Sequence, residues 1–362
     1  MHYYQIAEIT LKSTYVLPAF VSFACADTKP DMTLEKTDEL PPAGKDCVSG
    51  TIVHRRLQDG WFFHSKETDQ TGLYISEDYT YLKLLGNPYE DATETEERYI
   101  RIAIECLLIH RGYLSLHAAA VEYEGEVIAF TGPSGIGKST RAYAWLDELN
   151  ADLVSGDRPL VDARHGEIYG VPWDGKEACY RKVHYPLRAI CDIRRSASVY
   201  IRNMSFSQRR LLLMRQCFLP MWDTETAAIQ IANITQLAKN ATIVRIFSGP
   251  GREDARALKN ALQNHIFLQE EQDMKAKEDF VLRNVVDEYV LMPTGDNIVK
   301  FKGTVLLNEV SAFVWEKLQN PISKADLLQA ILDEYEVDRS VASADLDALL
   351  ATLKEYGVIE SD

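Results

Sequence analysis

The sequence predicts an α/β protein with a phosphate-binding P-loop in its central domain, a β-rich layer before that domain and a winged helix-turn-helix (α+β) domain after it. Three observations carry this prediction. Residues 132–139 read GPSGIGKS and fill the spacing G-x-x-x-x-G-K-[ST] at every defined position. Residues 1–95 hold several short strand-like runs between turn residues. Residues 279–362 hold three strand-like runs followed by three helical ones.

Composition limits the classes of partner. The chain has 362 residues, of which 46% are hydrophobic, and a net charge of -15. This charge argues against nucleic acid and against an anionic membrane surface as partners. The six cysteines form no C-x-x-C pair or His–Cys cluster, which predicts reduced thiols and no zinc site. No run approaches the ~20 apolar residues of a membrane span, so we expect a cytoplasmic protein.

Residues 1–95 are predicted to form the β-rich layer, to which the sequence assigns no chemistry. Strands are expected at residues 61–63, 72–75 and 79–85, with turns at 59–60, 72 and 86–88. The apolar run 15–26 contains Pro18 and has an acidic residue before it, which favours a strand over a secretory signal. Residues 26–50 are rich in Pro, Asp and Lys, which predicts a loop.

The P-loop predicts a nucleotide site for ATP or another nucleoside triphosphate with Mg²⁺. Glycines let backbone N–H groups converge on phosphate oxygens, and Lys138 would meet the β- and γ-phosphates. The Ser139 hydroxyl would bind Mg²⁺. The apolar run 127–130 predicts the strand before the loop, and residues 140–148 predict a helix whose dipole faces the phosphates. The expected nucleotide contacts are Gly132, Pro133, Ser134, Gly135, Ile136, Gly137, Lys138, Ser139 and Thr140.

Two further side chains are candidates for chemistry beside the P-loop. His117 lies in the run 114–121, which predicts one buried strand, and the turn after it leads directly into the P-loop strand. A histidine on an apolar strand is more often a core residue, but this order places His117 beside the phosphates. Asp157 ends another apolar run, where it could bind Mg²⁺ or accept a proton. The alternative is a turn residue that pairs with Arg158.

The rest of the central domain predicts a loop and an alternation of strands and helices. Residues 171–177 contain Pro, Gly and Lys176, and such a loop could close over a phosphate or a substrate, although exposed lysines are common. We expect strands at 186–193 and 242–247 and helices at 94–109, 205–235 and 252–267. The predicted domains are therefore 1–95, 96–267 and 279–362, with a charged linker at 268–278.

The last domain has the size and order of a winged helix-turn-helix. Its strands are expected at 280–283, 288–293 and 297–307, with a turn at 294–296, and its helices at 309–318, 324–335 and 343–356. Ser323 is expected to cap the second helix, with Asp326 in its first turn. The last two helices carry many more carboxylates than cations, which argues against DNA as the partner.

Residues 117–261 resemble the HPr kinase/phosphorylase-like P-loop kinases. The resemblance rests on His117, on the P-loop and on Gly156-Asp157-Arg158. It implies that Asp157 takes the proton of a serine hydroxyl as that hydroxyl attacks the γ-phosphate, and that His117 assists electrostatically. The chain departs from the family at Gly156, where the family has a first aspartate, and it lacks the later glycine-rich signature. Both departures argue against HPr as the substrate.

Residues 280–359 resemble PqqD-type peptide-recognition domains. The matching residues are Phe280-Val281-Leu282-Arg283, Tyr289-Val290-Leu291-Met292-Pro293, Leu307-Asn308, Ala312, Trp315-Glu316, Asp345, Leu353 and Gly357-Val358-Ile359. Similar domains bind the leader of a ribosomally made precursor peptide, which adds as a strand to the third strand and packs on the last helix. In the kinase region, Pro172-Trp173 and Gly175-Lys176-Glu177 resemble a loop of kinases that modify lasso-type precursors, which implies that Lys176 makes a second phosphate contact.

Together the resemblances imply a kinase for a ribosomal precursor peptide. The C-terminal domain would hold the leader while the P-loop domain phosphorylates a Ser or Thr hydroxyl in the attached core, at a local concentration of about millimolar. One alternative is a nucleotide-binding adaptor or chaperone for a partner enzyme, with Gly156 marking lost catalysis. Another is a kinase of a small hydroxy compound. A homo-oligomer is possible, although the hexameric state of HPr kinases cannot be transferred to this chain without their interface.

Overall fold

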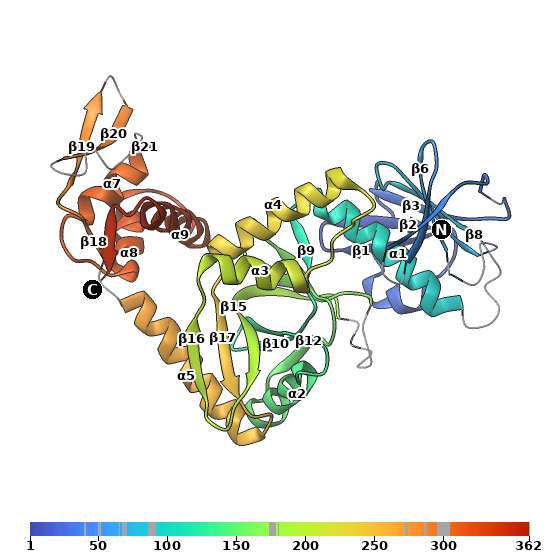
Figure 1. Ribbon diagram of the computed structural model, residues 1–362, viewed down its shortest axis with the longest axis horizontal. Coiled ribbons are helices and arrows are strands. Elements are labelled where there is room, and N and C mark those ends of the chain that lie inside the picture. Colours follow the sequence, from blue (N-terminus) through green and yellow to red (C-terminus); the bar gives the residue numbers. More distant parts are fainter. Residues whose placement is uncertain are drawn as a thin grey trace. The chain divides into compact units, whose positions relative to one another are not determined.

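The computed structural model shows a mixed α/β fold with several sheets (Figure 1). It describes residues 1–39, 41–49, 52–64, 66, 71–85, 92–173, 179, 181–271, 274–285, 288–294 and 305–361. The chain divides into two compact units, Met1–Leu258 and Lys259–Asp362. The segment 268–278, predicted as a linker, contains the end of helix α5 (Arg252–Glu271) and the short strand β18 (Met274–Ala276).

The first unit begins with an eight-stranded sheet in the order β1-β2-β3-β8-β7-β6-β5-β4. Its strands are β1 (His2–Ile6), β2 (Ile9–Ser13), β3 (Met32–Thr37), β4 (Asp46–Ser49), β5 (Ile52–Arg56), β6 (Gly60–His64), β7 (Gly72–Ser76) and β8 (Tyr81–Leu85). The region 26–50, predicted as a loop, thus supplies two strands, because Met32 and Leu34 alternate with polar residues and are buried. The predicted turn at 86–88 lies outside the described residues.

The run 15–26, predicted as a strand, is instead the 3₁₀-helix η1 (Pro18–Phe23). Its proline stands at the first helical position, and Phe20 and Phe23 lie three residues apart, one 3₁₀ turn. Both rings are buried in the core beneath the sheet. The helix therefore buries both aromatic side chains on the same side. In a β-strand, two residues that are three positions apart would point to opposite sides.

Helix α1 (Ala92–Ile109) packs on the sheet and joins it to the rest of the unit. Ile100, Ile104 and Leu108 are fully buried, and their cluster includes residues of the sheet as well as Val171 and Trp173 from the central domain. One hydrophobic core thus continues from the β-rich layer into the central domain. The layer is held by apolar packing and not only by its covalent connection.

The second sheet carries the glycine-rich loop. Its order is β12-β10-β11-β15-β14-β13-β9, with β17 paired to β15 and β16 paired to β17. The strands are β9 (Tyr113–Ser115), β10 (Ala118–Tyr123), β11 (Glu126–Thr131), β12 (Asp152–Ser155), β13 (Leu160–Asp162), β14 (Glu167–Tyr169), β15 (His184–Arg195), β16 (Tyr200–Asn203) and β17 (Ile243–Ser248). Strands β11, β15 and β17 run parallel, and β10 runs antiparallel to both β11 and β12. The start of β10 therefore lies at the edge where β11, β12, β15 and β17 end.

The predicted strand at 114–121 is two strands, and His117 lies between them. Strand β9 pairs with β13, whereas β10 pairs with β11 and β12. The chain changes partners at this point, which periodicity cannot reveal because both parts are apolar and buried. The predicted helix at 205–235 is also two helices, α3 (Phe206–Gln216) and α4 (Thr224–Asn240), the second capped by Asp223.

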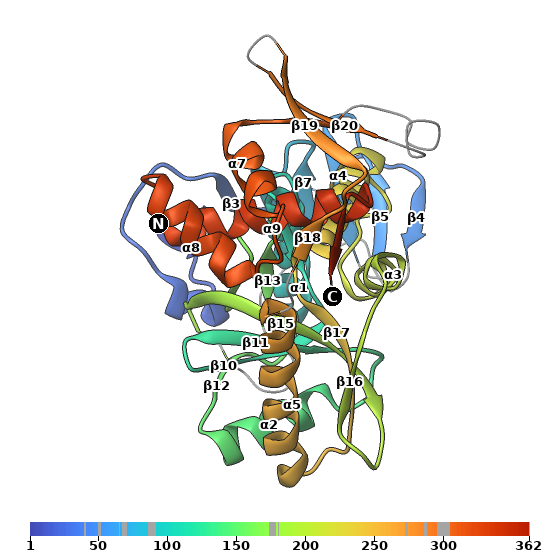
Figure 2. The same ribbon diagram turned by 90° about the vertical axis from the view of Figure 1, so that its left-hand side faces the viewer.

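Helices cover both faces of this sheet. Helix α2 (Lys138–Leu149) places Trp145 against Phe130 of β11, and its end lies beside the first turns of α5 through an Arg252–Asp147 ion pair of 2.8 Å (Figure 2). Helices α3 and α4 pack on the opposite face, where Leu213 and Leu237 belong to the same buried cluster as small residues of β10 and β11. The glycine-rich loop follows the end of β11 and leads into α2. It therefore runs from the edge of the sheet to the face that α2 covers, opposite α3 and α4.

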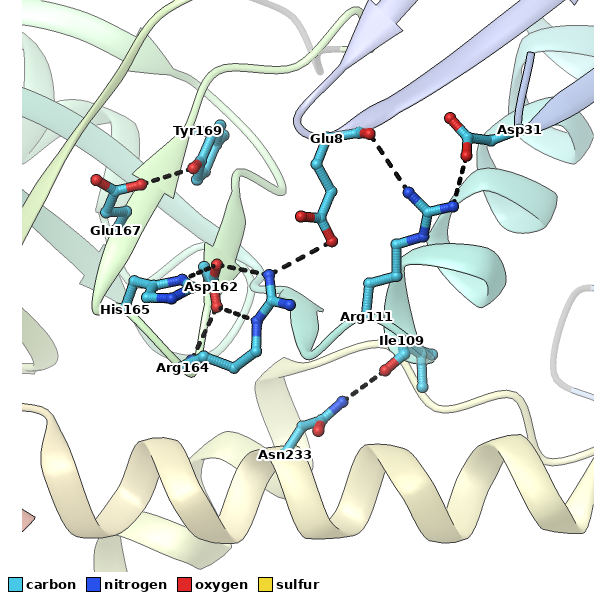
Figure 3. A network of polar contacts seen from close by, with 10 residues as sticks. All are labelled: Glu8, Asp31, Ile109, Arg111, Asp162, Arg164, His165, Glu167, Tyr169 and Asn233. Carbon is cyan, nitrogen blue, oxygen red and sulfur yellow. Dashed lines mark hydrogen bonds and ion pairs between the residues drawn. The ribbon is translucent and has the colours of Figure 1, made fainter. Parts of the chain in front are cut away.

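A polar network fastens the β-rich layer to β13 and β14 (Figure 3). Asp162 is buried and accepts hydrogen bonds from Arg164 Nε (3.0 Å) and Nη2 (2.9 Å), while its Oδ2 lies 2.8 Å from His165 Nδ1. Arg164 also pairs with Glu8 of the layer at 3.4 Å. Burial alone would raise the pKa of Asp162, but the hydrogen bonds from Arg164 and His165 outweigh it and lower that pKa.

We expect Asp162→Asn to lower the free energy of unfolding by about 2 kcal/mol at pH 7, because a charged acceptor of several hydrogen bonds is lost. A carboxylate with a lowered pKa stabilises the fold above its unfolded value of about 3.9, and this contribution is lost as the pH falls through the folded pKa. The variant should therefore lose less stability than the native chain on acidification below about pH 4. Urea unfolding between neutral and acidic pH measures both effects. Asp152→Asn, at an exposed carboxylate, is the control, and an equal acid loss in all three proteins would contradict the assignment.

The second unit contains a three-stranded sheet and three helices. The strands are β19 (Phe280–Val285), β20 (Glu288–Pro293) and β21 (Val305–Leu307), and the helices are α7 (Glu309–Lys317), α8 (Lys324–Glu334) and α9 (Arg339–Glu355). Strand β18 pairs with the unpredicted β22 (Ile359–Ser361). The cap at Ser323 is confirmed, since its hydroxyl accepts from Asp326 N at 3.1 Å. Residues 295–304, including most of the predicted turn and third strand, lie outside the described residues. Among the helices of the described parts, none combines the length and hydrophobicity needed to cross a membrane.

Candidate functional site

The glycine-rich loop lies between the predicted strand and the predicted helix. Strand β11 ends at Thr131 and α2 begins at Lys138. Gly137 has φ +104°, and a Cβ there would lie 2.8 Å from Arg141 Nη1, so only glycine fits. Gly135 has φ +74°, yet a Cβ there would meet no atom within 4 Å. The loop is thus closed toward α2 at Gly137 and open toward solvent at Gly135.

Two arginines hold this loop against the neighbouring strands. Arg141 is buried and donates from Nη1 to the carbonyl oxygens of Ile136 (3.3 Å) and Gly137 (3.2 Å). Its Nε donates to Ser248 Oγ at the end of β17 (3.0 Å). Arg195, at the end of β15, donates to the Gly135 carbonyl at 2.8 Å. The loop is therefore fixed to the carboxyl ends of β15 and β17 before any ligand binds.

His117 lies at the same edge as the loop. Its carbonyl accepts from Thr131 Oγ1 at 2.8 Å, and its N–H donates to the Gln216 carbonyl at 2.8 Å. The neighbouring Ala118 pairs directly with Thr131, the last residue before the loop. Burial and the nearby Lys138 ammonium lower the pKa of His117. The imidazole is therefore mainly neutral at pH 7.

Asp157 reaches the same edge from the loop after β12. Its Oδ1 lies 3.7 Å from His117 Nε2 and is buried without a hydrogen-bond donor within the described parts of the chain. The side chain as a whole remains 34% exposed. The backbone here is held by Ser155 Oγ, which donates to the Asp157 carbonyl at 2.8 Å, and it is strained at Arg158, with φ +55°. A carboxylate with an unused acceptor atom thus points into the edge of the sheet.

Lys138 completes this group. Its Nζ donates to the Gly132 carbonyl at 3.3 Å. Burial lowers the pKa of Lys138, while the charge of Asp157 acts in the opposite direction. The structure therefore brings His117, Lys138 and Asp157 together at the glycine-rich loop, with Ser139 and Thr140 in the first turn of α2. Lys176 lies outside the described residues, so its predicted phosphate contact stays a prediction.

Asp192 is a residue of this edge that sequence reasoning missed. It lies at the end of the parallel strand β15, fully buried, and accepts from Arg194 Nη1 and Arg245 Nε, each at 2.8 Å. A Cβ on Gly132 would lie 3.8 Å from its Oδ1. The available signal was the one that identified Asp157, a carboxylate at the end of an apolar run. Nothing local to Arg194 or Arg245 indicated that they converge on it.

The second unit has a groove of about 450 Å³ between β21 and α9. Its walls include Leu306 and Val310 on one side and Leu346 and Leu349 of α9 on the other. Strand β21 pairs with β20 along one edge, and no described strand pairs with its other edge. Leu306 is 63% exposed. The groove is thus bordered by an open strand edge and an apolar helix face.

Residues 288–359 match the model of the family described as "Coenzyme PQQ synthesis protein D (PqqD)". The predicted PqqD-type resemblance is confirmed for these residues, and the chain carries a PqqD-like domain at its C-terminal end. Among solved structures, TbiB1 in complex with the TbiA(beta) leader peptide is 26% identical, covering 24% of this chain and 94% of that chain, with a TM-score of 0.21. Lasso peptide synthetase B1 complexed with the leader peptide is also 26% identical, covering 24% and 96%, with a TM-score of 0.21. No curated protein matches the chain significantly.

Proposed function

We propose that this chain is an ATP-dependent kinase that phosphorylates a Ser or Thr hydroxyl of a ribosomally made precursor peptide, whose leader the PqqD-like domain captures. The observation that carries the proposal is the group of His117, Lys138 and Asp157 at the glycine-rich loop, with 3.7 Å between His117 Nε2 and Asp157 Oδ1. A buried carboxylate oxygen without a donor is suited to accept a hydroxyl proton. The PqqD-like domain in the same chain supports a peptide as the substrate that carries this hydroxyl group.

The residues of the loop fit a nucleoside triphosphate. The open space at Gly135 leaves room for phosphate oxygens, and the N-terminus of α2 favours negative charge. Lys138 would contact the β- and γ-phosphates, and Ser139 with Asp157 would hold Mg²⁺. ATP would supply the γ-phosphoryl group. Because Arg141 and Arg195 already hold the loop, little ordering would be needed on binding.

Asp157 is the general base in this proposal. It would accept the hydroxyl proton as the hydroxyl oxygen bonds to the γ-phosphorus and the bond to the β,γ-bridging oxygen breaks, with ADP leaving. Neutral His117 would position the carboxylate without adding a competing charge. Lys138 would offset negative charge on the phosphates. These roles need one aspartate, so Gly156 in place of a second one is compatible with the chemistry.

We also propose that the central domain has an HPr-kinase-like core and that the PqqD-like domain is a winged helix-turn-helix. The antiparallel β10 between β11 and β12 brings the histidine to the P-loop edge, as expected for an HPr-kinase-like core. Strands β19 to β21 with α7 to α9 have the content of a winged helix-turn-helix. In that domain the leader would add as a strand to the open edge of β21 and place apolar side chains against α9.

A glycine pair tests the P-loop directly. We expect Gly135→Ala and Gly125→Ala to destabilise the protein by similar amounts, about 1 kcal/mol, because both residues have positive φ and open surroundings. Only Gly135→Ala should weaken ATP binding, because only there would the new methyl group meet a phosphate. Calorimetric titration with ATP and Mg²⁺ measures the difference. Equal ATP affinity in the two variants would show that no phosphate binds beside Gly135.

One observation favours a second function, a nucleotide-binding adaptor for a partner enzyme. Gly156 replaces the first aspartate of the related kinases, which could mark lost catalysis. Mass spectrometry of the precursor peptide, incubated with the protein, ATP and Mg²⁺, separates the two. A gain of one phosphate supports the kinase. Leader binding without any gain would leave the adaptor. Phosphorylation of a small hydroxy compound at a rate unaffected by deletion of residues 279–362 would contradict both.

A further inference from the structure

An aromatic stack lies at the edge strand β16. The rings of Tyr200 and Phe247 are parallel within 7°, with centroids 4.3 Å apart. The Arg202 guanidinium lies 5.4 Å from the Tyr200 centroid and 5.2 Å from that of Phe247. Tyr200 nevertheless keeps 37% of its surface exposed. Phe247 stacks on one face of the Tyr200 ring, and β16 pairs only with β17 among the described strands, so no neighbouring strand lies on the other side of Tyr200.

The sheet topology places this stack at the edge that carries the glycine-rich loop. Tyr200 pairs with Phe247, the next-to-last residue of β17, and β17 runs parallel to β11. At the same end, Ser248 of β17 accepts a hydrogen bond from Arg141, and Arg195 of β15 binds the loop carbonyl of Gly135. Loop and stack are therefore connected through the ends of β15 and β17.

The stack and the acid–base group lie on opposite sides of the loop strand. Strands β10 and β12, which bring His117 and Asp157, follow β11 on one side, whereas β15, β17 and β16 follow it on the other. Three strand spacings of about 4.8 Å separate β11 from β16. A nucleotide on the loop with its γ-phosphate toward Asp157 can extend its other end over β15, β17 and β16, on the side of the loop away from Asp157.

We propose that Tyr200, with Phe247 stacked on one face of its ring and Arg202 beside both rings, is the stacking platform for the base of the bound nucleotide. This inference rests on the proposed function, because it takes the γ-phosphate to lie beside Asp157. Planar bases stack on aromatic rings and on guanidinium groups with little preference between bases. The platform therefore supplies affinity for the base, while the loop holds the phosphates.

The charge around the platform suits the same ligand. On this face of the sheet, Arg245 of β17 lies between two partners. Arg202 of β16 is its partner on one neighbouring strand, and Asp192 of β15 is its partner on the other. Together with Arg194 this makes three guanidinium groups for one buried carboxylate, in a chain whose net charge is -15. A local excess of positive charge beside the loop favours an anionic nucleotide over a neutral aromatic compound.

A pair of probes separates the base from the phosphates. The non-hydrolysable analogue AMP-PNP and inorganic tripolyphosphate, each with Mg²⁺, are titrated calorimetrically into the full chain and its variants. Tyr200→Ala should bind AMP-PNP about 10- to 100-fold more weakly, as expected for loss of one stacked base, and tripolyphosphate unchanged. Tyr200→Phe should bind both probes as the native chain does. Tyr356→Ala, at another exposed tyrosine, is the matched control and should also change neither.

The outcomes distinguish this platform from the P-loop itself. Unchanged AMP-PNP affinity in Tyr200→Ala would overturn the platform while leaving the phosphate site intact. An equal loss for both probes would assign Tyr200 a structural role only and would also overturn it. If the native chain binds neither probe, the proposed nucleotide site fails and the platform with it. Should Tyr200→Ala fail to fold, Tyr200→Leu, which keeps an apolar side chain of similar length but no aromatic face, provides the same comparison, with a several-fold loss expected for AMP-PNP alone.

Discussion

Asp157→Asn is expected to lower kcat for phosphorylation of the precursor peptide by about 100- to 10,000-fold, the range for loss of a general base. The amide keeps the size of the side chain but cannot accept the hydroxyl proton. Because the Oδ1 atom has no donor among the described residues, the substitution breaks no hydrogen bond to this atom within the described parts of the fold. Thermal stability should therefore change little. Single-turnover phosphorylation followed by mass spectrometry measures the rate, and calorimetry with AMP-PNP measures binding.

Asp152→Asn is the matched control, because Asp152 begins the strand β12 that Asp157 follows and its carboxylate is exposed. It should leave kcat unchanged. A normal rate in Asp157→Asn would show that another group takes the proton. A loss of rate no larger than the loss of AMP-PNP affinity would mean that Asp157 acts in binding, through Mg²⁺ or Lys138, and not as the base.

The parts of the site that could be predicted depend on short-range order in the chain. The glycine-rich loop is continuous in sequence, and its strand and helix follow from adjacent apolar runs. His117 could be placed because one tight turn separates its strand from β11. Asp192 could not be interpreted in the same way. Its environment is made by Arg245, more than fifty residues later, which reaches it only because β15 and β17 pair.

Errors in the fold have the same origin. The chain changes strand partners at His117, and the residues before and after this point do not differ in hydrophobicity. Strand β22 was missed because its pairing with β18 brings together residues more than eighty positions apart. The helix η1 was mistaken for a strand because a short apolar run does not by itself distinguish the two. In each case tertiary pairing selects between local structures that the residues allow equally.

Leu306→Asp is expected to lower kcat/KM for the leader-bearing precursor by at least about 100-fold while leaving kcat/KM for the leaderless core peptide unchanged. Leu306 is exposed on β21 and lines the groove, so a carboxylate there meets the apolar leader side chains without disturbing the core. In the proposed function the loss follows from tethering, because a bound leader would hold the core at about millimolar concentration near the proposed phosphorylation site. Initial rates with both peptides measure the effect.

Met292→Asp is the control for this variant. Met292 is 41% exposed on the middle strand β20 of the same sheet and does not line the groove. It adds the same charge to the same domain, so any effect on general folding or on the net charge should appear in both proteins. The losses in kcat/KM caused by removing the leader and by changing Leu306 should not be additive, since both changes remove the same contact. Additive losses would place the leader elsewhere on the domain. Unchanged rates with both peptides would show that the PqqD-like domain does not capture the substrate. That result would favour a kinase that recognises its acceptor through the P-loop unit alone.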